Sequence, residues 1–250
     1  MNINPSSLVL WFATEKCDVG CKHCCYPPLS GREPGTDEAK LLISNVAKLG
    51  AKYFAFIGGE PLLREDITDL VKYCINCRLK PYIVMKGGRL AGGEAEKLAK
   101  DLHRLGVKIT VAVDGVTHSV IDAICGKPEI YDRIMNTIKV CLKHNILQGF
   151  VTAALKPNIS EIPLTLDLAS KINLERCVIF GIRPTGRGRS TFNMFAPSPL
   201  EYEEFMRKIA LEARRGRWRQ EVFVYDPLFM RILKETSSQQ YSKICRVVIF

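Results

Sequence analysis

Three cysteines near the start of the chain are spaced closely enough to hold one metal centre. Cys17, Cys21 and Cys24 form the pattern C-x3-C-x2-C on a segment that follows an apolar run. Iron–sulfur clusters that only carry electrons normally have four protein ligands. Three thiolates would leave one iron of a 4Fe–4S cluster open. The triplet therefore predicts a cluster that takes part in chemistry.

A zinc site is the alternative for the same residues. Zinc favours four tetrahedral ligands, so Cys25 or His23 would have to complete the set. Zinc sites commonly draw cysteine pairs from two separate segments. A second C-x2-C pair, Cys74 and Cys77, lies inside an expected helix and is interpreted as buried or incidental. The triplet alone favours iron–sulfur and leaves zinc open.

A second motif, Gly58-Gly59-Glu60-Pro61, follows the next expected strand. Glycines let a backbone come close to a ligand, and a glutamate can accept a hydrogen bond from an ammonium group. The plain alternative is a turn at a strand end, closed by the proline. Gly58, Gly59 and Glu60 are therefore candidate ligand-binding residues.

The elements that must position these motifs alternate along the chain. Short β-branched runs predict strands, and the amphipathic stretches between them predict helices. The expected strands are 8–13, 53–57, 82–85, 107–113, 150–155 and 177–182, and the expected helices are 36–49, 66–78, 94–105, 131–144, 161–172 and one that starts at 199. We expect Thr36 to cap its helix and Leu49 to be buried. Such alternation predicts an α/β fold, a partial TIM barrel of about six βα units, with its site at the carboxyl ends of the strands.

The bulk composition is that of a globular protein, with 47% hydrophobic and 25% charged residues among 250. No apolar run near the start is long enough for a bilayer span or a signal sequence, so we expect a cytoplasmic protein with no membrane partner. The net charge is +10, and its densest run is 214–219. That run closes an expected helix, which favours a solvated helix end over nucleic-acid binding.

In combination and in this order, the cysteine loop and the Gly-Gly-Glu-Pro motif resemble the radical S-adenosylmethionine (radical SAM) superfamily, over roughly residues 8 to 190. The resemblance implies that the three cysteines ligate three irons of a 4Fe–4S cluster. It implies that the fourth iron binds S-adenosylmethionine. It also implies that residues 58–60 meet the amino group of that cofactor.

Further residues take roles from the same resemblance. His23 stands where many members carry an aromatic residue near the adenine. The sequence at Asp114 resembles a Ser-x-Asp-Gly segment with Ala112 in the serine position, so Asp114 is a candidate for ribose or substrate binding; a simple Asp-Gly turn is the alternative. Asn158 and Glu161 resemble an Asn-x-x-Glu pair, although helix capping explains Asn158 nearly as well.

A basic segment follows the sixth expected strand. Arg183-Pro184-Thr185-Gly186-Arg187 resembles the Pro-x-Gly-Arg segment of the branch with peptide-modifying and haem-pathway enzymes, the SPASM and related groups. Arg183, Arg187 and Arg189 would suit carboxylates on cofactor or substrate, and a flexible basic loop is the alternative. The branch implies a small-molecule, tetrapyrrole or peptide substrate and an electron donor such as ferredoxin or flavodoxin.

We expect a core domain over residues 1–215 and a short C-terminal extension over 216–250. SPASM-type proteins carry further cysteines for auxiliary clusters in such an extension. Here Cys245 stands without a glycine-rich cysteine array, so no auxiliary cluster is predicted; either the extension is absent or the sequence ends early. Cys125, Cys141 and Cys177 are expected in the core.

The predicted activity is reductive cleavage of S-adenosylmethionine to a 5′-deoxyadenosyl radical, which abstracts hydrogen from an organic substrate. The sequence singles out no catalytic residue beyond the cofactor ligands. The rival hypothesis is a non-catalytic module that binds zinc, iron–sulfur or nucleic acid. It would use the cysteines structurally and the arginines for phosphate.

Overall fold

The computed structural model describes residues 8–26, 32–236 and 245–246, and the chain divides into two compact units. The first unit takes in the residues up to Gly20 together with 26–111 and 132–147. The second takes in 21–25, 112–131 and the residues from Gln148 onward. Cys17 therefore belongs to the first unit, whereas Cys21 and Cys24 belong to the second.

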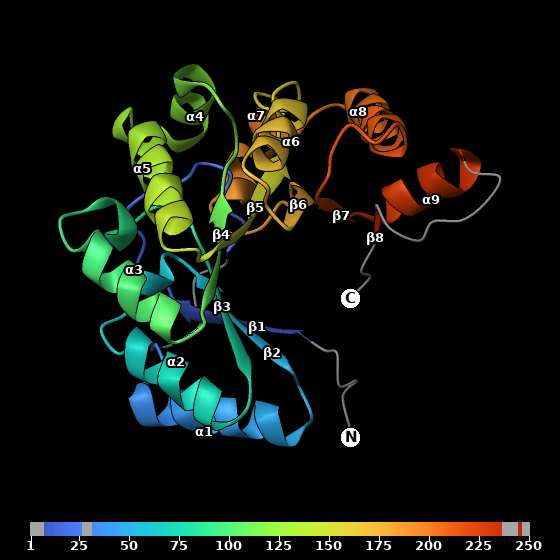
Figure 1. Cartoon of the computed structure of the whole chain (residues 1–250). Helices are drawn as coiled ribbons and strands as arrows, with labels where there is room; N and C mark the ends of the chain where they lie inside the picture. Colours follow the sequence, from blue (N-terminus) through green and yellow to red (C-terminus); the bar gives the residue numbers. More distant parts are fainter. Residues whose placement is uncertain (1–7, 27–31, 237–244, 247–250) are drawn as a thin grey trace. The chain divides into compact units, whose positions relative to one another are not determined.

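The first unit is a parallel sheet with helical crossovers, drawn blue to green in Figure 1. Its strands pair in chain order as parallel neighbours. These strands are β1 (Leu8–Thr14), β2 (Tyr53–Gly58), β3 (Lys80–Met85) and β4 (Lys108–Ala112), and the helices are α1 (Thr36–Lys48), α2 (Ile67–Asn76), α3 (Ala95–Arg104) and most of α5 (Glu129–Lys143). Phe54, Phe56 and Ile83 are fully buried, because strands covered by crossover helices place their apolar side chains in the core.

The second unit repeats this arrangement, with β5, β6, β7 and β8 as parallel neighbours, and is drawn largely in yellow to red in Figure 1. Its elements are α4 (His118–Cys125), β5 (Leu147–Ala154), α6 (Ile162–Lys171), β6 (Arg176–Gly181), α7 (Gly188–Phe195), α8 (Pro199–Arg214), β7 (Glu221–Tyr225), α9 (Pro227–Thr236) and β8 (Cys245–Arg246). Phe150 and Ile179 are buried on its strands. The expected strands and the longer helices are therefore confirmed, with shifts of a few residues at their ends.

Helix starts show which local signals were strong. The Ser198 Oγ accepts a hydrogen bond from the Glu201 amide at 3.2 Å, and the Glu201 carboxylate accepts one from the Ser198 amide at 2.7 Å. This reciprocal capping starts α8 where the sequence predicted. At α1 the prediction was wrong: Gly35 is the cap and Leu49 is 43% exposed. The Thr36 hydroxyl donates instead to Asp66, a partner that lies outside the helix.

Two short helices were not predicted. Both α4 and α7 have eight residues, and neither has a side-chain hydrogen bond at its N-cap. Helices of about two turns draw their stability from packing more than from local sequence, so periodicity alone reveals them poorly. The division at residue 215 stays a prediction.

No helix in the described ranges combines the length and the apolar character needed to cross a membrane.

Candidate functional site

The glycines of the second motif bring the end of β2 against the chain that leads to Cys17. The Gly59 amide donates to the Thr14 carbonyl at 2.7 Å, and the Glu60 amide donates to the Lys16 carbonyl at 2.7 Å. A Cβ on Gly59 would lie 2.2 Å from the Lys16 oxygen, and Gly58 has φ +127°. Glycine is therefore required at both positions by the close approach of two loops and by backbone conformation.

Glu60 is completely buried beneath this loop. Its Oε2 accepts a hydrogen bond from the Lys86 amide at 3.0 Å. Burial raises the pKa of Glu60 to about 7, and the charge of Asp18 adds to this; the Lys86 amide, the Gly88 amide and Arg133 oppose it. Its Oε1 has no hydrogen-bond partner within the described part of the chain. Glu60 therefore keeps an acceptor that the fold does not use.

The three predicted cluster ligands form no disulfide within the described ranges and are of intermediate exposure. Cys141 and Cys177, by contrast, are buried, and burial raises the pKa of each thiol to about 12. Partly exposed thiols without disulfides fit an iron–sulfur cluster, because metal and sulfide must reach them. Within the ranges that the structure describes, no group of three or more His, Cys, Asp and Glu side chains is close enough to hold a metal ion. Ligation by all three cysteines stays a prediction.

The basic segment after β6 holds the cysteine segment by hydrogen bonds within the second unit. The Gly188 amide donates to the Cys24 carbonyl at 2.9 Å, and the Thr185 hydroxyl donates to the Cys25 carbonyl at 2.8 Å. A Cβ on Gly188 would lie 2.7 Å from the His23 carbonyl oxygen. Two hydrogen bonds therefore connect this loop to the cysteine segment.

The arginines of this segment are exposed, so their guanidinium groups face solvent around a fixed backbone. Arg183 and Arg187 precede α7, and Arg189 lies in its first turn. Exposed guanidinium groups on a fixed backbone can bind a carboxylate with little reorganisation.

His23 and Asp114 are brought together as a pair. The His23 Nε2 lies 3.8 Å from the Asp114 Oδ2, and Asp114 is 3% exposed. The other oxygen, Oδ1, accepts a hydrogen bond from the Ala153 amide at 3.1 Å. The Asn158 amide group donates to the Asp114 carbonyl at 2.8 Å. Part of the hydrogen-bonding capacity of Asp114 is therefore used within the second unit, on residues at and after the end of β5.

Asn158 and Glu161 serve the fold directly. The Asn158 Oδ1 accepts from the Leu155 amide at 2.8 Å, and the side chain is fully buried. Asn158 does not cap α6, whose N-cap is Glu161, so the capping interpretation was wrong. The Glu161 carboxylate accepts from the Thr117 amide at 3.2 Å and from its hydroxyl at 2.5 Å, at the start of α4.

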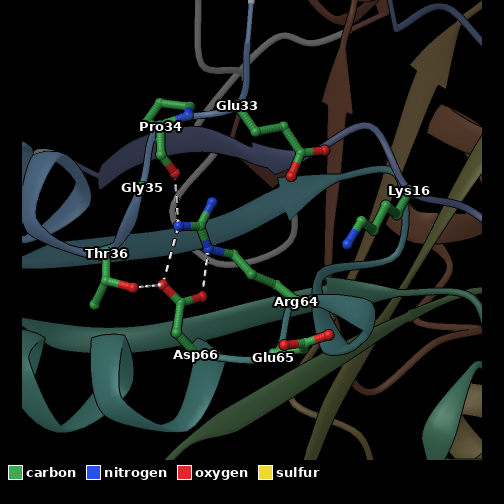
Figure 2. Close-up of a pocket in the computed structure, with 8 residues that line it drawn as sticks. All are labelled: Lys16, Glu33, Pro34, Gly35, Thr36, Arg64, Glu65 and Asp66. Atoms are coloured by element: carbon green, nitrogen blue, oxygen red, sulfur yellow. Dashed lines mark hydrogen bonds and ion pairs between the residues drawn. The ribbon is translucent and has the colours of Figure 1, made fainter.

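A pocket of about 340 Å³ in the first unit was not predicted (Figure 2). It is lined by Lys16, Glu33, Pro34, Gly35, Thr36, Arg64, Glu65 and Asp66. Figure 2 shows the Arg64 guanidinium between Pro34 and Asp66, to which it donates hydrogen bonds. Arg64 is 7% exposed and also donates to the Ala13 carbonyl at 2.8 Å. It therefore braces the end of β1, and no local sequence pattern marks an isolated arginine of this kind.

The basic run at 214–219 is partly paired with nearby carboxylates. Arg217 donates to Asp167 at 2.7 Å and to Glu212 at 3.1 Å. Trp218 is 3% exposed, and its indole N–H donates to the same Asp167 at 2.8 Å. This arrangement agrees with a helix end better than with an open phosphate-binding surface.

Comparisons with known proteins place these features in a family. Residues 11–169 match the model of the radical SAM superfamily, and this is more than half of the chain. The chain therefore belongs to the radical SAM superfamily. It is 31% identical over 207 residues to the AdoMet-dependent heme synthase of Methanosarcina barkeri, covering 81% of this chain and 57% of that protein. It is 27% identical over 245 residues to the Fe-coproporphyrin III synthase of the same organism, covering 91% of this chain and 59% of that protein.

The fold comparison agrees with the family. The structure of SuiB from Streptococcus suis bound to S-adenosylmethionine superposes with a TM-score of 0.72 at 13% identity, covering 93% of this chain and 53% of that one. The expected α/β partial TIM barrel is confirmed. The family uses a 4Fe–4S cluster and S-adenosylmethionine, which are the predicted cofactors. The chain spans less than two thirds of the length of each of these relatives.

Proposed function

We propose that this chain carries out the radical SAM reaction, with a 4Fe–4S cluster held by Cys17, Cys21 and Cys24. The observation that carries the proposal is the family match, which includes three partly exposed cysteines in the required spacing that form no disulfide within the described ranges. When bound, the reduced cluster and S-adenosylmethionine supply a 5′-deoxyadenosyl radical that abstracts hydrogen from a substrate.

Residues 58–60 would receive the amino group of S-adenosylmethionine. An ammonium group needs acceptors, and backbone carbonyl oxygens of this loop would be one source of them. Glu60 offers Oε1, which has no partner among the described residues. Because the pKa of Glu60 is about 7, a neighbouring ammonium would favour its ionised form and strengthen the hydrogen bond.

The second unit would contact the remaining parts of the cofactor. We assign His23 to stacking on the adenine, Asp114 to the ribose or the substrate, and Arg183 to a carboxylate. The support for His23 and Asp114 is their 3.8 Å separation beside the cysteine segment. The support for Arg183 is its exposed position on the loop that holds that segment.

For the substrate we propose a tetrapyrrole that carries propionate groups, with a peptide as the competing class. Two relatives are named for haem and iron-coproporphyrin synthesis, and three exposed arginines are chemically suited to propionates. The electron donor would be a small reduced protein such as a ferredoxin or a flavodoxin. Cysteines that form no disulfide within the described ranges, together with the proposed cluster, suit the reducing cytoplasm.

Anaerobic reconstitution with iron and sulfide tests the reaction. With dithionite and S-adenosylmethionine, we expect 5′-deoxyadenosine to be released, and Cys24→Ala to reduce its yield by about a hundredfold. Cys141→Ala is the matched control, because this buried cysteine on α5 is not part of the C-x3-C-x2-C motif. A protein that binds zinc and cleaves no cofactor contradicts the proposal.

Titration with iron coproporphyrin tests the substrate class. We expect an absorbance change that saturates, and an affinity about tenfold weaker in Arg183→Gln combined with Arg187→Gln. Arg104→Gln is the control, since Arg104 is an exposed arginine on α3. No saturable change, or equal affinity in all three proteins, argues for the peptide class.

A further inference from the structure

A cysteine outside the predicted cluster motif contacts one of the predicted ligands. The Sγ atoms of Cys21 and Cys125 are 3.7 Å apart. Cys125 is the last residue of α4 and is 4% exposed, whereas Cys21 is partly exposed. From sequence alone Cys125 was a core thiol with no role.

Hydrogen bonds of the neighbouring residues fix this contact. The Lys22 amide donates to the Ile124 carbonyl at 3.0 Å, and the Lys22 ammonium donates to the Ala123 carbonyl at 3.0 Å. Gly126 ends α4 with a left-handed φ of 71°, which exposes these last carbonyls to Lys22. Cys21 precedes Lys22 and Cys125 follows Ile124, so the two cysteines flank a backbone hydrogen bond that holds their segments together.

The separation of the two sulfurs is short enough for covalent closure. A disulfide bond is about 2.05 Å long, so the sulfurs need to approach by less than about 2 Å. Side-chain rotation with small backbone shifts supplies movement of this size. The partly exposed Cys21 can react first with an oxidant, and the buried Cys125 is then in place to resolve the product.

We propose that Cys21 and Cys125 form a disulfide in the metal-free protein under oxidising conditions. With oxidised glutathione as oxidant, the Cys21 thiolate attacks one sulfur and one glutathione leaves as a thiol. The Cys125 thiolate then displaces the second glutathione. The protein loses two electrons and two protons, and glutathione disulfide is reduced to two thiols. The consequence rests on the proposed function: a linked Cys21 cannot ligate iron, so cluster assembly stops until the bond is reduced.

Mass spectrometry tests the bond itself. The full chain is prepared without metal under anaerobic conditions, treated with oxidised glutathione, blocked with N-ethylmaleimide and digested. We expect the Cys21–Cys125 linked peptide to exceed any other cross-link of Cys21 by about tenfold, because these thiols are held in contact. Pairing of Cys21 mainly with Cys17, Cys24 or Cys25, or its recovery as a free or only glutathionylated thiol, overturns the proposal.

Cluster uptake tests the consequence. Each oxidised sample is divided, and one portion is reduced again with dithiothreitol. The oxidised portion of the wild type should take up about fivefold less iron and sulfide than the reduced portion, whereas the two portions of Cys125→Ala should take up equal amounts. Cys141→Ala, another buried helical cysteine, should behave like the wild type. Equal losses in Cys125→Ala and the wild type contradict the inference. A mapped disulfide in a protein that assembles no cluster even when reduced refutes the proposed function and leaves the disulfide standing.

Discussion

Glu60 and Glu161 are two glutamates near strand ends, and the structure uses them differently. The carboxylate of Glu161 accepts hydrogen bonds from the Thr117 hydroxyl and from the amides that begin α4. The carboxylate of Glu60 is buried, has a pKa raised to about 7, and keeps Oε1 without a partner among the described residues. Both residues belong to motifs that resemble those of the same family.

The difference separates a residue that supports the fold from one that is available to a ligand. A carboxylate whose oxygens are filled by the protein gains little from a cofactor. A buried carboxylate with an unused oxygen destabilises the ligand-free protein, and a cationic ligand that binds this oxygen reduces the destabilisation. Motif resemblance alone cannot make this distinction, because it depends on hydrogen-bond partners that are distant in sequence.

The largest expected effect is a loss of stability when Gly59, the residue before Glu60, is replaced. Gly59→Ala places a Cβ 2.2 Å from the Lys16 carbonyl oxygen, so the two loops must separate. We expect the free energy of unfolding of the metal-free protein to fall by about 4 kcal/mol in urea titrations. Gly93→Ala is the control, because nothing lies within 4 Å of its added Cβ, and it should change by less than about 0.5 kcal/mol. Equal stability of both variants shows that the close approach is not rigid.

The next effect is a pH dependence of stability. The pKa of Glu60 is raised from 4.5 to about 7 in the folded protein, so the folded state holds this proton more tightly than the unfolded state. The free energy of unfolding should therefore be highest below pH 4.5 and fall as the pH rises to about 7. Relative to Glu60→Gln, the wild type should lose on the order of 3 kcal/mol across this window.

Unfolding in urea at pH 4.5, 6 and 8 measures this difference. The exposed Glu65 provides the control, since Glu65→Gln should run parallel to the wild type. A constant gap between the wild type and Glu60→Gln would mean that the buried carboxylate reaches water or a counter-charge. The contrast with Glu161 would then disappear.

The smallest effect concerns Glu161. Glu161→Ala removes the acceptor for the start of α4, and we expect a loss of about 2 kcal/mol in unfolding free energy. After cluster reconstitution, the affinity of Glu161→Ala for S-adenosylmethionine should stay within about twofold of the wild-type affinity. The affinity of Glu60→Gln should be about tenfold weaker than that of the wild type. Glu204→Ala, an exposed glutamate on α8, should change neither quantity. Similar cofactor affinities for Glu161→Ala and Glu60→Gln would refute the distinction.

The sequence predicted what local patterns encode. The strands followed from β-branched runs, and α8 followed from a capping box that needs only residues 198–201. Family resemblance in the two leading motifs agreed with the family match. These patterns involve residues close together in the sequence, so they can be recognised without knowing the tertiary contacts.

What could not be predicted depends on residues far apart in the chain. Cys125 gained a partner 104 positions away, and Arg64 braces the carbonyl of Ala13, 51 positions away. Helix α4 is short, and the amides of Val116 and Thr117 at its start donate hydrogen bonds to the Glu161 carboxylate. None of these contacts leaves a periodic trace in the sequence, because each is specified by the packing of several elements.

The Gly188 amide donates to the Cys24 carbonyl, and the Thr185 hydroxyl donates to the Cys25 carbonyl. The loop that carries the arginines is therefore hydrogen-bonded to the segment of the proposed cluster ligands. In the proposed function, a carboxylate bound by the neighbouring arginines would act on the same loop that is hydrogen-bonded to the cysteine segment. If the proposed cluster and carboxylate sites are coupled in this way, thermodynamic linkage requires that cluster loading change the carboxylate affinity by the same factor. Cooperativity between cluster loading and carboxylate binding would then be carried by these two hydrogen bonds.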